Sequence, residues 1–203
     1  MNLFSGGPNE FRISGTYVVI RAGARIIAPE NVAIGSHVMI DDFVFIGRHR
    51  RMAIGNHVHL ATGSSITGGG DCAICDFAGV SSGARILTGT DDFLGGGLTG
   101  PTIPSRFREV HRGQVVVERH AVIGANAIVL PDVVIGEGAT VGAGSVVSKN
   151  LEPWSVYVGA PARRVKGRPE QRIRELEYAL LQEEGAPAIV FDNVTILDRL
   201  FGS

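Results

Sequence analysis

The sequence of 203 residues has few of the features that mark several common classes of protein. Its only cysteines, Cys72 and Cys75, cannot build a disulfide framework or a four-cysteine zinc site. Neither charge dominates, since 19 Lys and Arg stand against 20 Asp and Glu, whereas nucleic-acid-binding and polybasic membrane-surface proteins normally show a basic excess. No apolar run approaches the roughly 18 residues of a membrane span. We therefore expect neither a nucleic acid nor a membrane among the partners.

The beginning of the chain shows no export signal. Residues 1–10 contain neither the basic segment nor the apolar segment of a secretory signal. Because the cysteines also give no disulfide framework, we expect a cytoplasmic protein.

Glycine and β-branched residues are abundant, whereas aromatic residues make up only 6% of the chain. Glycine accounts for 28 residues, about twice its usual share of roughly 7%, and there are 23 valines and 18 isoleucines. This composition favours strands and tight turns over a helical bundle. With so few rings, the core must consist of small branched side chains.

Aliphatic residues recur every six positions, with some steps of eight, over most of the chain. A period of six fits neither a helix nor a simple amphipathic strand, but it fits a short strand followed by a turn. Three such units form one coil of a triangular solenoid, with the aliphatic residue pointing inward and a small residue four positions later at the corner. The predicted inward positions are Ile20, Ile26, Ile34, Ile40, Ile46, Ile54, Leu60, Ile66, Ile74, Val80, Ile86, Val117, Ile123, Val129, Ile135, Val141 and Val147. The predicted corner positions include Val38, Val44, Val58, Ala78, Ala84, Ala139 and Ser145.

The length of the repeat sets the number of coils. Four segments of 20 residues, the first beginning at Ser14, are followed by two segments of 18. This indicates six coils. Parallel strands stack about 4.8 Å apart, so the prism would be roughly 30 Å long.

This repeat resembles that of the hexapeptide-repeat acyltransferases, whose hexad is an aliphatic residue, a glycine and, at the fifth position, a small residue. The likeness extends over about residues 14–168 and is clearest at 122–149, with Pro153-Trp154 and the run 159–162 after it. It implies an all-β solenoid, a left-handed parallel β-helix with a long loop between coils and a C-terminal α-helix. It also implies a homotrimer with active sites between neighbouring prisms, and transfer of an acyl group from a coenzyme A thioester.

The hexads stop between Ile86 and Val117, where the chain is rich in glycine and proline. So long a loop in a compact domain is usually functional or disordered. In the family such a loop leaves the prism and closes over the active site of an adjacent subunit. A disordered insertion is the alternative.

The boundaries expected from these patterns divide the chain into two parts. Residues 1–168 form the β-helix acyltransferase domain, with loop 87–116, and residues 169–203 form a C-terminal helix and extended tail. An apolar face and a proline in the first turn predict a helix from Pro169 to Glu184. The segment 186–203 is expected to be a strand or an extended arm that packs against another subunit.

The sequence offers several candidates for the catalytic base. Galactoside and antibiotic acetyltransferases carry a histidine at the start of the long loop, but the matching stretch 88–93 has none. Asp92 and Asp91 are the candidates there, because a carboxylate can orient a sugar amine or accept its proton. The alternative is that they cap the loop by accepting bonds from backbone N–H groups. His59, which could face the same cleft, is the second candidate, and His111 in the loop is the third.

Coenzyme A binding follows from the resemblance. In the family the pantetheine arm lies between two prisms against small residues, and a Ser/Thr-Lys pair and later basic residues lie near the phosphates. The matching cofactor-binding positions are Ala125, Ala143, Ser148, Lys149, Arg163 and Lys166. Clustered basic side chains suit a polyanionic cofactor. The alternative is a solvated basic patch.

Three histidines, His37, His57 and His120, share the third position after an inward aliphatic residue. A three-histidine zinc site, as in the β-helical carbonic anhydrases, is one interpretation. Tyr17 and Phe77 occupy the same position, however, so a column of planar side chains explains the pattern better. We expect no metal site.

Together these features predict an acetyltransferase that uses acetyl-CoA as co-substrate. The pattern of the loop resembles the branch that acetylates amines of nucleotide-linked deoxy sugars, which implies a role in bacterial surface polysaccharide biosynthesis, such as lipopolysaccharide O-antigen. The alternatives are a sugar O-acetyltransferase of the same fold, a zinc carbonic anhydrase-like lyase and a non-catalytic β-helix scaffold.

Overall fold

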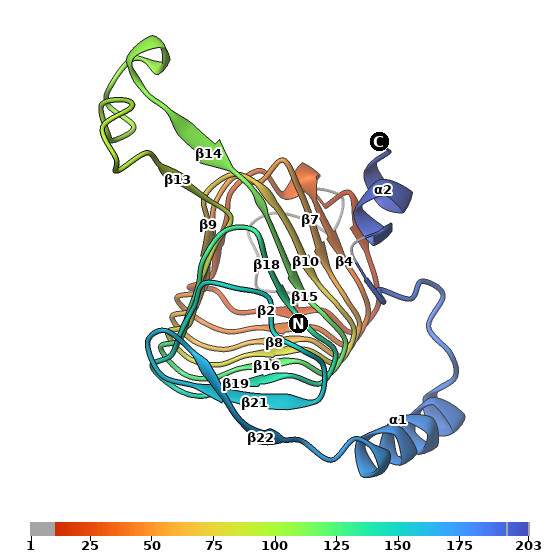
Figure 1. Cartoon of the computed structure of the whole chain (residues 1–203). Coiled ribbons are helices and arrows are strands. Elements are labelled where there is room, and N and C mark those ends of the chain that lie inside the picture. The colour runs from red at the N-terminus through yellow and green to blue at the C-terminus, as the bar shows by residue number, and fades with distance from the viewer. Residues whose placement is uncertain (1–10, 194, 203) are drawn as a thin grey trace.

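The structure, a computed structural model, describes residues 11–193 and 195–202. The segment 1–10, in which we looked for an export signal, lies outside the described residues. Short strands stack in parallel into three sheets that form the faces of a triangular prism (Figure 1). The predicted left-handed parallel β-helix is confirmed. Among the described residues, no helix has the length and apolar character needed to cross a membrane.

Each of the three faces is one sheet whose strands come from successive coils. The first face consists of β1 (Ile13–Ser14), β4 (Val32–Ile34), β7 (Arg51–Ile54), β10 (Asp71–Ile74), β15 (Gln114–Val117) and β18 (Val133–Ile135). The second consists of β2 (Val19–Ile20), β5 (Met39–Ile40), β8 (His59–Leu60), β11 (Gly79–Val80), β16 (Val122–Ile123), β19 (Thr140–Val141), β21 (Ser155–Val158) and β22 (Arg163–Gly167). The third consists of β3 (Arg25–Ile26), β6 (Phe45–Ile46), β9 (Ser65–Thr67), β12 (Arg85–Leu87), β17 (Ile128–Val129) and β20 (Val146–Val147).

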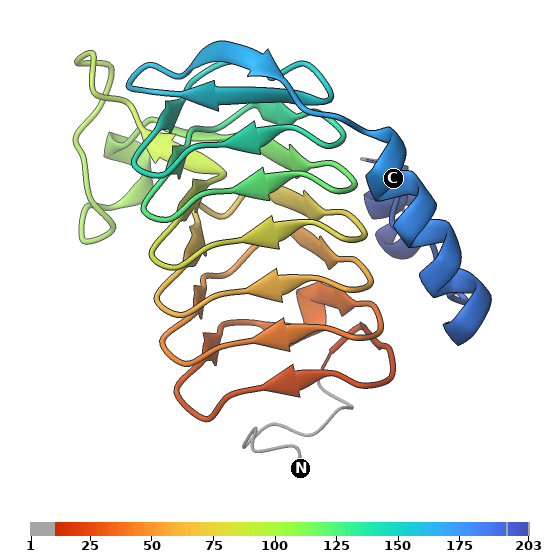
Figure 2. The ribbon, with the colours of Figure 1, turned by 90° about the horizontal axis from the view of Figure 1, so that it is seen from below.

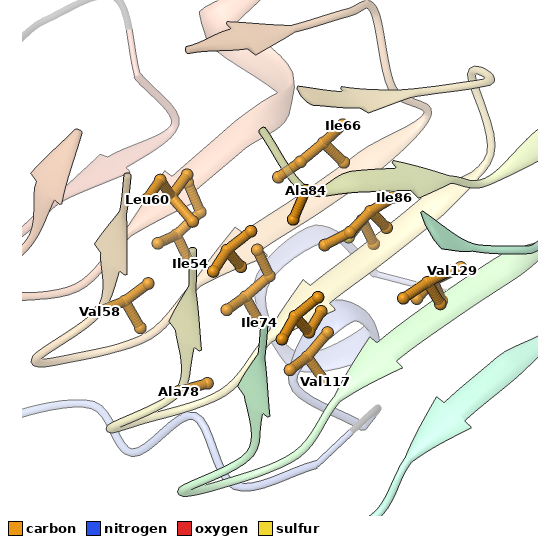
Figure 3. Packing of buried hydrophobic residues seen from close by; sticks show 14 of the residues in the cluster. Ile54, Val58, Leu60, Ile66, Ile74, Ala78, Ala84, Ile86, Val117 and Val129 are labelled. Atoms are coloured by element: carbon orange, nitrogen blue, oxygen red, sulfur yellow. The ribbon is translucent and has the colours of Figure 1, made fainter. Parts of the chain in front are cut away.

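Register in the stack is set by the hexads. Ile54 pairs with Ile34 on one side and with Ile74 on the other, so equivalent residues lie directly above one another. All the predicted inward aliphatic residues are buried, and so are the predicted corner residues (Figure 3). Burying one such side chain contributes about 1.5–3 kcal/mol. The stack of small side chains is therefore the main source of stability, and few rings are needed.

The prism has about seven turns rather than the six predicted. Leu151 forms an isolated parallel bridge with Ile135, and β21 pairs in parallel with β19. The hexad pattern did not predict the extra turn, because Pro153 and Trp154 occupy the positions where the next hexad would begin. Strand β22 then pairs antiparallel with β21 and closes this end of the second face.

The predicted loop leaves the prism between β12 and β15. It contains a two-stranded antiparallel ribbon, β13 (Gly89–Asp91) and β14 (Val110–Arg112), and a short 3-10 turn, η3 (Ser105–Phe107). A second 3-10 turn, η2 (Pro29–Asn31), lies in an early coil. Figure 1 shows the ribbon projecting outward from the stacked coils. The loop is thus an ordered arm and not a disordered insertion.

The C-terminal helix α1 (Gln171–Glu184) is confirmed and begins two residues later than predicted. It runs beside the prism, back toward the early coils, and not across the open end (Figure 2). None of its residues is buried. Glu177 fixes the helix to the prism through Arg119 and His120. Polar contacts therefore hold this helix.

The prediction of a strand or extended arm over 186–203 is wrong. Among the described residues of this segment, α2 (Thr195–Phe201) is a helix and no strand occurs. Residues 194 and 203 lie outside the described part. Ile196 and Leu197 pack with Phe191 on the outer side of the first face of their own chain, where that face presents small residues, Ala53, Ala73, Cys75 and Val116. Four of the seven residues of α2 are apolar, and this pattern is compatible with a helix and with a strand. The sequence alone therefore does not distinguish the two.

Candidate active site

The predicted catalytic carboxylates line a hollow of about 660 Å³ at the base of the arm. We call it the loop hollow. It is built by β13 and β14 and the turn that follows β13. Its lining residues are Thr90, Asp91, Asp92, Phe93, Leu94, Gly96, Glu109 and His111. Three carboxylates, those of Asp91, Asp92 and Glu109, and the His111 imidazole thus line one open hollow on the arm.

Both aspartates take part in loop-capping bonds. The Leu94 and Gly96 N–H groups donate to the Asp92 carboxylate, and these bonds hold its pKa below the ordinary value. The Gly100 N–H and then the Arg108 guanidinium do the same for the pKa of Asp91. Both groups are therefore ionised and weakly basic. They shape the loop and place negative charge in the hollow.

His111 is the histidine that the structure brings to this hollow. Its Nε2 lies 2.5 Å from Oδ2 of Asp132, a residue of the next coil. His111 is thus paired with a carboxylate and also lines the loop hollow. This pairing is the usual way to orient a general base. Asp132 was missed by the sequence reasoning, because only the stacking of coils reveals that it faces His111.

His59 lines a different hollow on the same chain. This face hollow, of about 270 Å³, lies on the second face and is lined by His59, Ala61, Gly79, Val80, Ser81, Ser82 and Val122. The His59 Nε2 lies 2.9 Å from Oδ2 of Asp41. The lining of the face hollow and that of the loop hollow share no residue. Within one copy, His59 and Asp92 therefore do not line a common space.

Three predicted coenzyme A residues meet at the last turns of the prism. Ser148, Lys149 and Arg163 line one end hollow of about 200 Å³. Asn150 and Arg164, which the sequence reasoning did not select, line it as well. The strand β22 folds back on β21 and carries the arginines toward the lysine. Three cationic side chains around one small hollow suit phosphate groups.

The other three cofactor candidates lie outside the lining of this end hollow. Ala125 and Ala143 are neighbours on successive coils, where the Gly144 N–H donates to the Ala125 carbonyl at 2.8 Å. Lys166 is exposed on β22, paired with Val156. The small side chains leave backbone accessible at the turn, whereas Lys166 faces solvent.

The three histidines proposed as a zinc site do not converge. Phe77 separates His57 from His120 in a column of stacked rings. His120 instead pairs with Glu177 of α1. The three-histidine ligand set of a carbonic anhydrase-like lyase is therefore not formed by these residues.

The two cysteines are packing residues. Both are free and buried. Burial raises the pKa of Cys72 to about 12 and that of Cys75 still further above its ordinary value. Neither is a reactive thiolate at neutral pH.

Comparison with known proteins agrees with this geometry. The family described as bacterial transferase hexapeptide (six repeats) matches residues 114–149. An acyltransferase of Escherichia coli named for dTDP-4-amino-4,6-dideoxy-D-glucose is 36% identical over 91% of this chain and 93% of its own. A lipopolysaccharide biosynthesis O-acetyltransferase of the same species, WbbJ, described as putative in its name, is 28% identical over 72% of this chain and 74% of its own.

Solved structures extend the comparison. AntD, an N-acyltransferase from Bacillus cereus, is 38% identical and superposes with a TM-score of 0.83 over 90% of this chain and all of its own. It has been solved with dTDP and coenzyme A, and also with dTDP and 3-hydroxybutyryl-CoA. PerB from Caulobacter crescentus, at 22% identity and a TM-score of 0.56, shares the fold.

A prism of hexapeptide coils with a projecting loop and a cationic hollow at its last turns, together with these relatives, defines an acyltransferase of the hexapeptide class. The chain belongs to the hexapeptide-repeat acyltransferases. It is an acyl-CoA-dependent N-acyltransferase of that family.

Proposed function

We propose that the protein transfers the acetyl group of acetyl-CoA to the amine of a dTDP-linked 4-amino-4,6-dideoxyhexose. The observation that carries the proposal is the match over nearly the whole of both chains to the Escherichia coli acyltransferase named for such a sugar. AntD structures that hold the same dTDP-linked amino sugar with coenzyme A support it. We extend the proposal to a role in surface polysaccharide synthesis, such as that of lipopolysaccharide O-antigen, which the similarity to WbbJ supports.

The chemistry requires one bond to form and one to break. The sugar amine attacks the thioester carbonyl, the C–N bond forms, and the C–S bond breaks to release coenzyme A as a thiolate. A base takes the proton of the amine, and the thiolate, with a thiol pKa near about 8.5, leaves readily. Backbone N–H groups at the turns stabilise the carbonyl oxygen as it becomes negative.

His111 is the base in this scheme, and the aspartates position the acceptor. An imidazole held by Asp132 has one nitrogen free for the amine, whereas Asp92 is already bonded to two N–H groups of the loop. The remaining lone pairs of Asp92 and Asp91 bind the amine and the neighbouring hydroxyl. His59, which lines the face hollow, contacts the substrate in this scheme.

The complete site lies between two copies of a homotrimer. His59 and Asp92 line separate hollows of one chain, so they act on one substrate only if the arm of one copy covers the face of its neighbour. In AntD, an aspartate and a serine ten positions earlier have been substituted in complexes with dTDP and coenzyme A. Ser82 and Asp92, like Ser81 and Asp91, are ten positions apart here, and both serines line the face hollow.

Coenzyme A takes the end hollow and the adjoining surface of the last coils. Lys149 and Arg163 bind its phosphates, and Ser148 donates to the diphosphate. The pantetheine arm passes Ala125 and Ala143, where small side chains allow close approach to the backbone. Lys166 on β22 adds charge at the ribose phosphate.

A thiol-release assay tests the function. Acetyl-CoA is supplied with dTDP-4-amino-4,6-dideoxyglucose, with the same sugar on UDP, and with dTDP-glucose, which offers only hydroxyl groups. We expect release with the dTDP amine, at a kcat/KM at least about tenfold above that with the UDP compound. The same acceptors with 3-hydroxybutyryl-CoA identify the acyl group.

The acceptors separate the alternatives. Release with dTDP-glucose but with neither amine would establish O-acetylation and overturn the proposal. If no acceptor gives thiol release although coenzyme A binds, the remaining alternative is a non-catalytic scaffold. Acetyl-sugar product identified by mass and by a shifted proton signal at carbon 4 would confirm the amide.

A further inference from the structure

One corner of the prism carries a continuous column of rings. The rings come from equivalent positions of the coils, and each has a backbone φ between 49° and 60°. In the coil between His120 and Trp154 this position is Gly138, and the Trp154 ring lies against its backbone. This left-handed turn directs every side chain along the same outward line. The members are Tyr17, His37, His57, Phe77, His120 and Trp154.

Within this ring column, two imidazoles are adjacent and clamped. His37 and His57 stack with centroids 4.7 Å apart and planes 10° apart. Phe77 stacks on the far side of His57 at 4.7 Å, and Tyr17 packs on the far side of His37 at 4.8 Å. Neither imidazole can rotate away without losing a ring contact. Their outer edges therefore lie side by side at this corner.

The end of α1 meets these two edges. Glu184, the last residue of the helix, places Oε2 3.5 Å from Nε2 of His57 and 3.8 Å from Nε2 of His37. The three ligand atoms all lie within 4.8 Å of one another. The side chains of His57, His37 and Glu184 are 17%, 34% and 37% exposed, so the cluster is accessible to water and ions.

The spacing of helix and coils brings Glu184 to this place. Glu177 contacts His120, and Glu184 follows it by seven residues, which is about 10.5 Å along an α-helix. His57 lies two coils before His120, and two coils of parallel strands measure about 9.6 Å. The helix therefore presents a carboxylate to the column every second coil. Sequence could not show this, because the direction of α1 along the corner comes from the tertiary structure.

We propose that His37, His57 and Glu184 form a site for one divalent transition-metal ion of the zinc class. Two imidazole nitrogens and one carboxylate are a known zinc ligand set that leaves one position for water. Ligand atoms bonded to one tetrahedral ion at 2.0–2.1 Å are about 3.4 Å apart. The two separations from Glu184 are close to this, whereas the two imidazole nitrogens must come closer together, so metal binding requires the His37 and His57 rings to tilt out of their parallel stack.

The contacts of Glu184 differ from those of a hydrogen-bonded ion pair. Its Oε2 lies 3.5 Å and 3.8 Å from the two imidazole nitrogens, which is longer than a direct hydrogen bond to either. Arg119, stacked over Phe77, is a cation beside the same column and is already paired with Asp76 and Glu177. A bound ion would connect the end of α1 to two early coils.

Calorimetric titration of the tag-free, chelator-treated full chain with zinc chloride tests the site. We expect one ion per chain, and a loss of affinity of about tenfold or more in Glu184→Gln and in His57→Phe. Phenylalanine suits the column, as Phe77 shows. Glu183→Gln is the matched control, since it removes the same charge one residue earlier and should bind zinc as the wild type does.

Two further measurements decide the outcome. Cobalt should give the intense visible absorption of a four-coordinate ion in the wild type but not in Glu184→Gln. Zinc should raise the unfolding temperature of the wild type and of Glu183→Gln but not that of His57→Phe. The proposal is overturned if no zinc binds at one equivalent, or if Glu184→Gln and Glu183→Gln bind it equally.

Discussion

His111 and Asp132 form an imidazole–carboxylate pair at the base of the projecting arm, with Nε2 and Oδ2 2.5 Å apart. The first residue belongs to β14 and the second to the turn before β18, so the pair links the arm to the prism. His111 also lines the loop hollow. One contact thus orients an imidazole and fixes the arm that carries it.

Replacement of His111 should remove the base. His111→Gln is expected to lower kcat by about 10²-fold or more, because the amine then has no positioned proton acceptor. Asp132→Asn should give a smaller loss and shift the pH profile of kcat. Both side chains are more than half exposed, so folding should be preserved. Glu109→Gln, which removes a charge from the same hollow, is the control. A wild-type kcat in His111→Gln would assign the proton to substrate or coenzyme.

Mixing of subunits tests whether the site is shared between copies. Asp92→Asn and His59→Ala are each expected to be poorly active alone. If the arm of one copy serves the face of another, random mixed trimers should contain about one intact site in four, and about a quarter of wild-type activity should return. Activity is measured after co-expression and compared with trimers of each variant. If verified mixed trimers regain no activity, the site is not shared between copies in this way. Asp92 and His59 would then belong to one chain's site, or one of them would have no role in catalysis.

The cationic residues of the end hollow should act on coenzyme A and not on chemistry. Arg163→Gln is expected to raise the KM for acetyl-CoA about tenfold with little change in kcat, since a bond to a charged phosphate is worth about 1.5–3 kcal/mol. Arg172→Gln, on the exposed helix α1, is the control. With acetyl-CoA lacking its ribose phosphate, the difference between Arg163→Gln and wild type should shrink if Arg163 binds that group. An undiminished difference would move Arg163 to the diphosphate.

Most of the fold was predictable from the hexad repeat, whereas the candidate catalytic residues lie outside that repeat. A side chain in every sixth position is buried by stacking alone, so Ile54 and its equivalents were predictable from spacing. Asp92 was predictable as a hollow-lining residue because the pattern stops there. Asp132 and Glu184 were not, since each meets its histidine only through the packing of coils and of α1. The turn at Leu151 was missed because Pro153 interrupts the period.

Acidification should destabilise the fold through its buried histidines. Burial is the largest cause that lowers the pKa of His49, His57 and His120 below the ordinary value of 6.5. In the unfolded chain these groups take up protons as the pH falls through about 6.5, while the folded chain resists protonation. The unfolded state then binds more protons than the native state, so the free energy of unfolding decreases as the pH falls and is fully retained above about pH 7. Chemical denaturation of metal-free protein between pH 8 and pH 5.5 measures this.

The variant His57→Phe tests how much of that pH dependence comes from His57. It keeps a ring in the column, beside Phe77, but removes one of the groups whose protonation differs between the two states. The slope of the unfolding free energy against pH should therefore become shallower than in the wild type. Equal slopes in wild type and His57→Phe would mean that His57 titrates alike in both states, and the burial that lowers its pKa would then have no effect on stability.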